Sequence, residues 1–308
     1  MLSLFVTCLL SLSAVAADDS VLLFSYFTGN GEDGLHFAAS EDGLEWKALR
    51  DGAPVLAPAV GKKEQLIRDP CIAQGPDATY HMVWTPGWQE RGIGYAHSKD
   101  LRHWSEQRWL PVMEHIDDAR NAWAPELFYD AARERWLIFW ASTVPSRFPA
   151  GKDNPEGEWN HRMYFTETRD FETFTEAALL YDQGFSVIDS TMVRTDDGYA
   201  MFLKDETRLP PQKNIRGAHA DNPAGPWSAP SAPITGDYWA EGPTAIRWDG
   251  RWLVYFDKYQ DHRYGVVAST DLEHWEDWSD RLHMPDGLRH GTVFRVPRGI
   301  AEGLAGDE

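Results

Sequence analysis

Four acidic residues stand at corresponding places along the sequence, each at the start of a short apolar or β-branched run. The segments "IRDPCIAQ", "WAPELFYD", "VIDSTMVR" and "WAEGPTAIR" carry Asp69, Glu126, Asp189 and Glu241. A carboxylate among apolar neighbours costs free energy unless it is paired or used. Carboxyl groups that a fold brings together can act as a general acid and a general base. Acids that precede strands also cap turns, which is the structural alternative for each of the four.

The chemistry that such a cluster suits is the hydrolysis of glycosidic bonds. That reaction needs one protonated carboxyl for the leaving oxygen and one ionised carboxylate on the other side of the sugar. Because like charges at close range raise one pKa, we expect Asp189 to keep Glu241 protonated near neutral pH. The chain also holds 15 Trp, 11 Tyr and 14 Phe, whose rings serve as platforms for sugars and equally fill cores.

The overall charge narrows the class of partner. A net charge of −19 argues against nucleic acid and against anionic lipid, and it is compatible with a carbohydrate substrate. The sequence contains no glycine-rich phosphate loop that ends in Lys-Ser/Thr and no HExxH zinc motif. Nucleotide and zinc-peptidase chemistry therefore find no support, and the sequence does not predict an oligomeric state.

The first sixteen residues read as an export signal. Leu2 to Leu12 form an apolar run, and the small residues Ala14, Val15 and Ala16 precede an acidic pair. A membrane anchor or a buried first strand is the alternative, but the run is too short to span a bilayer. We expect cleavage after residue 16, a secreted or periplasmic chain, and no membrane insertion once the signal is removed. Cys71 would then be the one cysteine left, and we expect it to fill the core.

A repeat organises the rest of the chain. In three segments a Ser precedes a Trp by six residues, and related segments carry Thr168 with Phe174 or a Trp one residue later. Each segment reads as an alternating strand, a tight turn and an aromatic residue that packs between neighbouring units. The five segments are "LHFAASEDGLEWKAL", "IGYAHSKDLRHWSE", "RMYFTETRDFETFTE", "IRGAHADNPAGPWSA" and "GVVASTDLEHWED".

Five such units predict an all-β fold, a five-bladed β-propeller closed by the C-terminal strand. A further strand-like run precedes each repeat segment, and an acid-bearing run precedes four of those, so each unit has about four strands. The first unit lacks its innermost strand, which "RHGTVFRV", from Arg289 to Val296, would supply. We expect residues 17–308 to form this single catalytic domain. A β-sandwich is the alternative fold.

The propeller gives the four acids a common location. Innermost strands line the central axis, so residues at their starts meet at one funnel. Asp69, Glu126, Asp189, Glu241 and the region of His290 would therefore form a cluster although they are far apart in sequence.

The four motifs resemble those of glycoside hydrolase family 43, a family of five-bladed propeller enzymes. The matching residues are "RDP" with Asp69, "WAPE" with Glu126, "ID" with Asp189 and "EGP" with Glu241, in the family's order. The resemblance implies that Asp69 is the general base, that Asp189 tunes pKa and orients, and that Glu241 is the general acid. It also implies hydrolysis with inversion.

The resemblance also suggests further site residues. The second motif usually ends in Asp, so we expect Glu126 to contact the substrate in a different way here. His290 lies where the family often holds a central water or a metal ion, so we expect it to contact substrate or, less readily, to bind a structural Ca or Na ion in the central channel; no cofactor is required. We further expect Arg68, Trp123, Trp239, Trp88 and Lys204 to bind the sugar. Packing is the alternative for the aromatic residues, and ion pairing with Asp205 or Glu206 is the alternative for Lys204.

The expected function is exo-acting removal of a terminal furanose or pentose, most of all α-L-arabinofuranose, with β-xylose and galactofuranose as alternatives. The insertion "STVPSRFPAGKDNPEGEWNHR" at 142–162 would favour a single terminal sugar if it overhangs the funnel. Two rival functions are a retaining fructosidase-like propeller enzyme and a sugar-binding propeller without catalysis. The retaining enzymes carry an "NDPNG"-like segment that this chain lacks.

Overall fold

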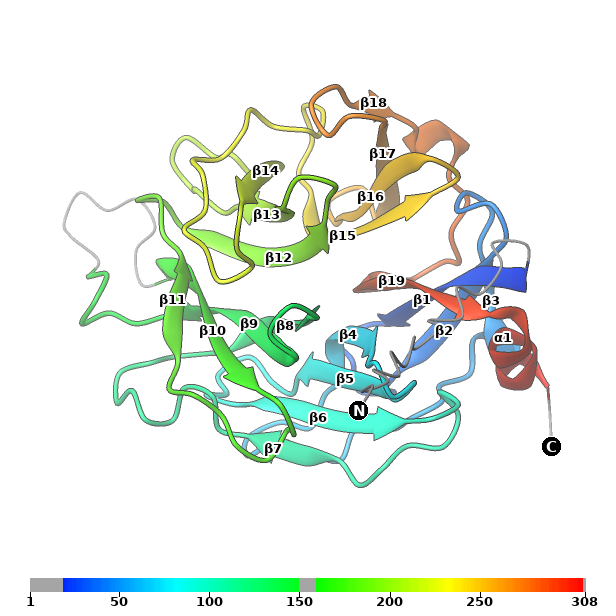
Figure 1. Ribbon diagram of the computed structural model, residues 1–308, viewed down its shortest axis with the longest axis horizontal. Helices are drawn as coiled ribbons and strands as arrows, with labels where there is room; N and C mark the ends of the chain where they lie inside the picture. The colour runs from blue at the N-terminus through cyan, green and yellow to red at the C-terminus, as the bar shows by residue number, and fades with distance from the viewer. Residues whose placement is uncertain (1–18, 150–158, 307–308) are drawn as a thin grey trace, which may run out of the picture.

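Five antiparallel sheets arranged around a common centre make up the fold. The computed structural model describes residues 19–149 and 159–306, so the expected signal at residues 1–16 lies outside the described part of the chain. Figure 1 shows the strands β4, β8, β12, β15 and β19 nearest the centre of the ring. The sequence prediction of a five-bladed β-propeller is confirmed.

Each sheet is named here by its strands in order from the centre outward. The first holds β19 (Arg289–Pro297), β1 (Ser20–Phe27), β2 (His36–Ser40) and β3 (Lys47–Ala48). The second holds β4 (Arg68–Gln74), β5 (Tyr80–Thr85), β6 (Ile93–Ser98) and β7 (Arg108–Leu110). The third holds β8 (Trp123–Asp130), β9 (Arg135–Thr143), β10 (His161–Thr168) and β11 (Ala178–Tyr181). The fourth holds β12 (Val187–Arg194), β13 (Tyr199–Asp205) and β14 (Asn214–Ala220), and the fifth holds β15 (Glu241–Trp248), β16 (Arg251–Lys258), β17 (Arg263–Ser269) and β18 (Glu276–Asp277).

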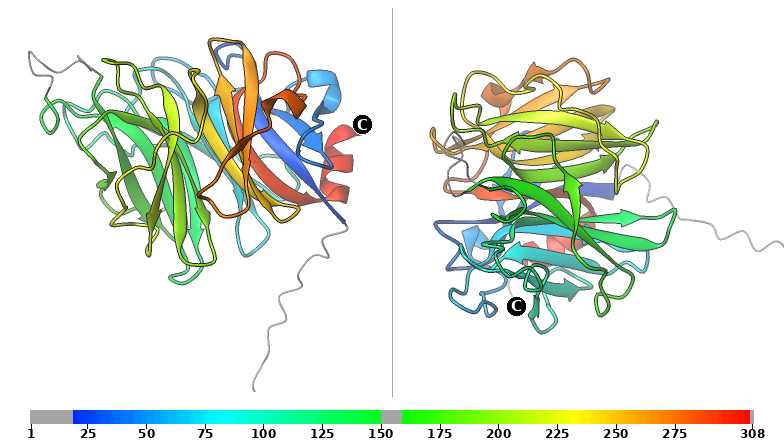
Figure 2. Two further views of the ribbon diagram at one scale, coloured as in Figure 1. Left: turned by 90° about the horizontal axis from the view of Figure 1, so that it is seen from above. Right: turned by 90° about the vertical axis from the view of Figure 1, so that its left-hand side faces the viewer.

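The two ends of the described chain meet in the first sheet. Strand β19 pairs with β1 in antiparallel register, with Phe24 opposite Val293, and so supplies the inner strand as predicted. The helix α1 (Arg298–Ala305) follows at once and contacts both strands (Figure 2). Its own residues Ala301 and Leu304 are buried. No helix in the described residues has the length and apolar character needed to cross a membrane.

The Ser-to-Trp repeat builds the same turn in successive sheets. The hydroxyl of Ser40 accepts a hydrogen bond from the backbone of Gly43 at 2.9 Å, and the indole of Trp46 donates back to the carbonyl of Gly43 at 3.1 Å. Ser98 and Ser269 accept equivalent backbone bonds. Because the side chain replaces a backbone partner, the repeat fixes a tight turn at the outer end of each hairpin.

The aromatic side chains pack between sheets, as the repeat predicts. Trp46 lies edge-on to Phe24 at 5.6 Å and to Tyr255, a residue of the fifth sheet, at 5.8 Å. Trp275 of the fifth sheet meets Phe202 of the fourth at 5.4 Å. Such large rings fill the wedge between twisted sheets and stabilise the ring as a whole.

The fourth sheet departs from the expected four strands, since it has three within the described residues. The segment that would form its outer strand contains Pro223, Pro226, Pro230 and Pro233. A proline has no backbone N–H and cannot donate to a ladder, so the segment makes an isolated bridge between Arg216 and Pro233 instead.

Candidate active site

Four of the inner strands carry a β-bulge near their first residues. The ladder shifts register there, and one residue in each adopts a positive φ: 50° at Asp69, 45° at Ala124, 48° at Asp189 and 57° at Gly242. A bulge re-aims a side chain and ends the regular pairing. In the second and fourth sheets the bulged residue is itself an acid, so the backbone strain directs a carboxyl to the mouth of the ring.

These strand starts surround a cavity of about 360 Å³. Nine of the ten site residues that the sequence predicts line it, and the exception is Glu126. The predicted lining residues are Arg68, Asp69, Trp88, Trp123, Asp189, Lys204, Trp239, Glu241 and His290. They come from all five sheets or from the loops that join them, so the common mouth expected of the funnel is present.

Asp69 is held as a carboxylate on one wall of the cavity. Its Oδ2 accepts a hydrogen bond from Thr85 at 2.8 Å, and its Oδ1 lies 3.4 Å from Nδ1 of His290. Burial alone would raise the pKa of Asp69, but the hydrogen bond and charge of His290 and the charge of Arg68 outweigh burial and lower it to about 2. Asp69 is therefore ionised throughout the neutral range.

His290 is a buried cation that lines the cavity. Burial lowers its pKa, but the hydrogen bond to Asp69 and the charges of Asp189 and Asp69 raise it to about 9. The ring also lies 4.0 Å from Asp189. A side chain on residue 242 would meet the ring of His290 at 2.4 Å, so the close approach of these two strands requires Gly242.

Asp189 is the acid with the raised pKa. Its Oδ2 accepts a hydrogen bond from the backbone N–H of Gly242 at 3.1 Å, which fixes it beside Glu241. Burial raises the pKa of Asp189 to about 6; the charge of His290 lowers it, while the charge of Glu241 raises it. The sequence predicts that Asp189 and Glu241 interact, and here the charge of Glu241 raises the pKa of Asp189.

Glu241 lies between two cations that the sequence reading did not assign to it. Its Oε2 accepts from Lys204 at 2.9 Å, and its Oε1 lies 3.3 Å from the guanidinium of Arg289. Arg289 in turn donates to the buried Asp257 at 2.7 Å. Burial lowers the pKa of Lys204, but the charges of Glu241, Glu206 and Asp189 outweigh it and raise the pKa. Lys204, predicted to bind sugar, is thus held against the predicted acid.

Lys204 also belongs to a series of ion pairs along the cavity lining. It contacts Glu206 at 2.8 Å, and Glu206 is paired with Lys213. The side chain of Lys204 is 3% exposed and that of Lys213 is 9% exposed. Removal of one partner of a buried ion pair leaves the other charge buried and unpaired, which is strongly destabilising. Such pairs therefore keep their side chains in place.

Aromatic side chains form the rim on two sides. Trp88 and Trp239 expose 45% and 40% of their surface, which is unusual for Trp in this chain. Trp88 is fixed by Arg68, whose guanidinium lies 4.3 Å from the ring centre, and Trp239 lies 6.0 Å from Tyr259. Tyr259 also lines the cavity and was not predicted.

The insertion at 142–162 is described only at its ends, because residues 150–158 lie outside the described part of the chain. Its last residues reach the rim: the rings of Trp159 and Trp123 stack at 5.2 Å with an interplanar angle of 22°. His161 lies 4.9 Å from Trp123 and is buried. The expectation that the whole insertion overhangs the cavity stays a prediction.

Glu126 lies below the cavity, inside the ring. It is 5% exposed and accepts a hydrogen bond from Thr191 at 3.1 Å. Burial raises its pKa to about 7, against the charge of His290 and the hydrogen bonds of Thr191, Cys71 and Thr292. Cys71 is buried, as expected, and its sulfur accepts from the backbone of Leu127. The direct contact with substrate that we predicted for Glu126 has no matching position at the cavity wall.

The residues around His290 do not fit a directly bound metal ion. No group of three or more His, Cys, Asp and Glu side chains in the described residues is arranged to hold one. The pKa of His290 is raised to about 9, so a metal ion would have to compete with a proton for its ring nitrogens. The expected calcium or sodium ion in the central channel stays a prediction, and no step below uses it.

A five-bladed propeller whose mouth gathers three carboxyls and several aromatic rings belongs to the class of propeller glycosidases. The family described as "Probable glycosyl hydrolase domain", which is related to glycoside hydrolase family 43, matches residues 19–301. The chain belongs to this family.

The chain is also similar to three known proteins. An alpha-L-arabinofuranosidase of Bifidobacterium longum is 28% identical over 142 residues, which cover 42% of this chain and 13% of that protein. The chain thus matches a small part of this relative's length. A crystal structure of a thermostable family-43 glycoside hydrolase shares 17% identity at a TM-score of 0.55, and an alpha-L-arabinofuranosidase from Lactobacillus brevis shares 21% at 0.53. Each covers 69% of this chain and 72% of the other, and at these identities they show the fold.

Proposed function

We propose that the chain is an exo-acting, inverting glycoside hydrolase that removes a terminal furanose or pentose. The observation that carries the proposal is the cavity in which Asp69, Asp189 and Glu241 meet although they come from three separate sheets. The α-L-arabinofuranosyl unit is the first choice, because the Bifidobacterium relative bears that activity in its name. Units of β-xylose and galactofuranose follow.

Asp69 acts as the general base. It is ionised at neutral pH because His290 pairs with it, and a carboxylate at the cavity wall can take a proton from a water that attacks the anomeric carbon. His290 holds the orientation of that carboxylate, and Thr85 fixes the second oxygen.

Glu241 acts as the general acid, and Asp189 is its partner. The charge of Glu241 raises the pKa of the neighbouring Asp189, so the two carboxyls are electrostatically linked, and Glu241 is the one that delivers the proton. Transfer to the glycosidic oxygen leaves Glu241 as an anion, and Lys204 and Arg289 lie within contact of its two oxygens to stabilise that charge. The cations therefore favour the product side of the proton transfer.

The rim supports removal of one terminal sugar. Trp88, Trp123 and Trp239 offer ring faces around a cavity of about 360 Å³, which has room for a single sugar and part of the next. Arg68 lies beside Trp88 and can donate to sugar hydroxyls. We also propose that the protein works outside the cytoplasm, as a secreted or periplasmic enzyme, on the strength of the N-terminal sequence.

The test is sugar release from aryl arabinofuranosides, xylosides, galactofuranosides and fructans. We expect release of one sugar by the wild type and a fall of about 10²–10⁴-fold in kcat with Glu241→Gln, the range for loss of general acid catalysis. An activated leaving group with a low pKa should lose least, because it needs the acid least.

The rival functions give different results in the same experiment. Proton NMR of the first product anomer distinguishes inversion from retention, and a retained anomer would reject the inverting mechanism. Release of fructose alone would favour a fructosidase. Sugar binding by both proteins without release from any substrate would identify a binding protein and refute catalysis.

A further inference from the structure

A second cavity lies beside the active site, on the same face of the ring. It has a volume of about 500 Å³, and Lys63, Gln89, Arg91, Arg120 and Trp159 are among its lining residues. These residues come from loops at the cavity end of the strands: the segment before β4, the β5–β6 connection, and the segments that precede β8 and β10.

The two cavities share an aromatic wall. Trp123 lines the active site and stacks on Trp159, which lines the second cavity. Trp88 lines the active site, and the next residue, Gln89, lines the second cavity. The indole of Trp123 donates to the backbone carbonyl of Trp88 at 2.9 Å, which ties this wall together. If a bound saccharide extends from the active site across this wall, the sugar unit next to the terminal one would lie in the second cavity.

The lining of the second cavity is cationic. Three basic side chains, Lys63, Arg91 and Arg120, face one acid, Asp117. The guanidinium of Arg91 donates to the backbone carbonyls of Ile116 at 3.3 Å and Asp117 at 3.1 Å. Carbonyl oxygens orient a guanidinium without cancelling its charge, so Arg91 keeps its attraction for an anion.

The carboxylate of Glu90, the residue before Arg91, is engaged with the backbone. Buried Glu90 accepts hydrogen bonds from the backbone N–H groups of Lys62 at 2.8 Å and Lys63 at 2.5 Å. These bonds fix the segment that presents Lys63 to the cavity. In a chain of net charge −19, a cationic cavity of this kind is a local exception that an acidic ligand needs in order to approach.

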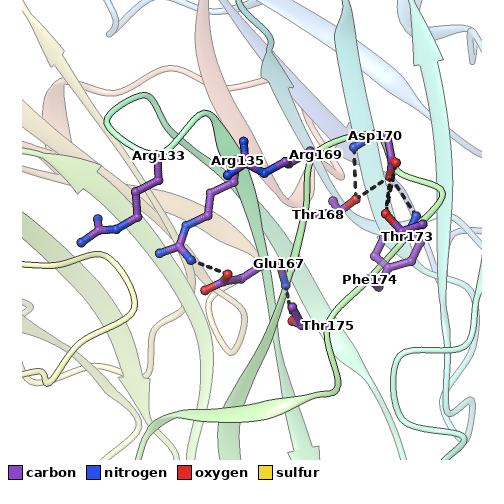
Figure 3. Close-up of a pocket in the computed structure, with 9 residues that line it drawn as sticks. All are labelled: Arg133, Arg135, Glu167, Thr168, Arg169, Asp170, Thr173, Phe174 and Thr175. Carbon is purple, nitrogen blue, oxygen red and sulfur yellow. Dashed lines mark hydrogen bonds and ion pairs between the residues drawn. The ribbon is translucent and has the colours of Figure 1, made fainter.

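A cavity at the opposite end of the third sheet shows the contrast. It measures about 570 Å³ and also holds three arginines, which Figure 3 shows with their neighbours. There Arg133 and Arg135 each contact buried Asp130 at 3.2 Å, and Arg135 also pairs with Glu167. Carboxylates therefore neutralise much of the positive charge in that outer cavity, and no aromatic wall joins it to the active site.

We propose that the second cavity is a subsite for a sugar unit with a negative charge, a carboxylate or a sulfate ester, next to the sugar that is cleaved. The face of Trp159 supports the sugar ring, and Lys63 and Arg91 bind the anionic group. This proposal rests on the proposed function and adds the substrate class: an acidic polysaccharide that carries the terminal sugar.

Binding tests the subsite independently of hydrolysis. Calorimetry with the Glu241→Gln protein compares a glucuronic-acid-bearing oligosaccharide, its carboxyl-reduced neutral counterpart and a sulfated oligosaccharide of the same length. We expect at least one acidic form to bind about tenfold more tightly than the neutral one, the effect of one charge-assisted hydrogen bond. The preference should shrink between low and high salt, because ions screen the contact. The stronger of the two acidic probes identifies the anionic group.

Two charge reversals locate the effect. Lys63→Glu, at an exposed position, should abolish the preference for the acidic probes, whereas Arg169→Glu in the outer cavity makes the same change in net charge and should leave it intact. Equal binding of acidic and neutral probes would refute the subsite, and so would an equal loss in both variants or no binding of any probe. A preference for acidic probes together with no hydrolysis of any glycoside would refute the proposed function and leave the subsite standing.

Discussion

Asp69 and Glu126 lie on neighbouring inner strands, and each is largely withdrawn from solvent, with 12% of the Asp69 side chain exposed and 5% of Glu126. Their pKa values nevertheless move in opposite directions, to about 2 and about 7. Burial opposes ionisation in both. The difference is that Asp69 has both a hydrogen bond from His290 and the charge of Arg68, while Glu126 has the charge of His290 alone and hydrogen bonds from hydroxyl and thiol groups.

The comparison teaches that the placement of cations decides which acid in this ring is ready for chemistry. Burial in the ring does not decide it, because these two buried acids on neighbouring inner strands have pKa values that move in opposite directions. One matched pair of substitutions, acid to amide, can test this at both positions without a large change of shape.

The largest expected effect is that of Asp69→Asn. An amide cannot accept a proton from water, so we expect kcat to fall about 10²–10⁴-fold on the best substrate of the panel. Steady-state kinetics measures the fall. A decrease smaller than tenfold would mean that another group is the base and that the pairing with His290 has a structural purpose.

A smaller loss is expected for His290→Gln, which removes the cation and keeps a hydrogen-bond donor. The pKa of Asp69 should rise from about 2, because burial is then less opposed, and the acidic limb of kcat/KM should move toward neutral pH. The midpoint of the acidic limb measures the shift: a rise of one pKa unit lowers kcat/KM about tenfold only at pH values below that midpoint and leaves it nearly unchanged at pH 5. An unchanged acidic limb would contradict the role of His290.

The stability of the same variant checks the sign of the coupling. The pKa of His290 is raised in the folded chain, from 6.5 to about 9, so its contribution to the free energy of unfolding is fully present below pH 6.5 and is lost as the pH rises through 9. His290→Gln should therefore differ most from the wild type below pH 6.5 in urea unfolding and approach it above pH 9.

The smallest effect on activity is expected for Glu126→Gln, within about threefold, because Glu126 does not line the sugar cavity and general acid–base loss is much larger. Stability should respond instead. The pKa of Glu126 is raised in the folded chain, so the stabilising effect of its proton is present below pH 4.5 and is lost as the pH rises through 7.

Urea unfolding at pH 4.5 and pH 8 checks this difference. Above pH 7 the Gln variant should be more stable than the wild type, by at most roughly 3 kcal/mol, since each pKa unit corresponds to about 1.4 kcal/mol. Asp69→Asn should have the opposite sign at pH 8, because the lowered pKa of Asp69 stabilises the chain above pH 3.8 and that effect is lost only as the pH falls through 2. A common sign for both amides would refute the explanation from cations.

Much of the fold could be read from the sequence. The Ser-to-Trp turns are local, so Ser40 and Trp46 signal them directly, and the strand at His290 has the alternation that β19 uses. The positions of Asp69, Asp189 and Glu241 followed from the propeller once its repeats were recognised. Those residues all line the cavity.

Other features could not be read in the same way. Glu126 follows the proline of its motif, whereas Asp69 and Glu241 precede theirs, so alignment on Pro70, Pro125 and Pro243 would have placed Glu126 further along its strand. The contacts of Arg289 and Lys204 with Glu241 depend on how two distant strands approach each other. No spacing in the sequence contains that information. The absence of an outer strand from the fourth sheet, within the described residues, is likewise seen only when that sheet is compared with its neighbours.

The pairing of β19 with β1 has a consequence for the order in which the protein becomes competent. His290 is synthesised more than 200 residues after Asp69, yet Asp69 depends on it for its charge state. A nascent chain that lacks its final strand would carry all three acids and still lack the cation that prepares the base. Catalysis, if it begins as we propose, would therefore report that the ring has closed.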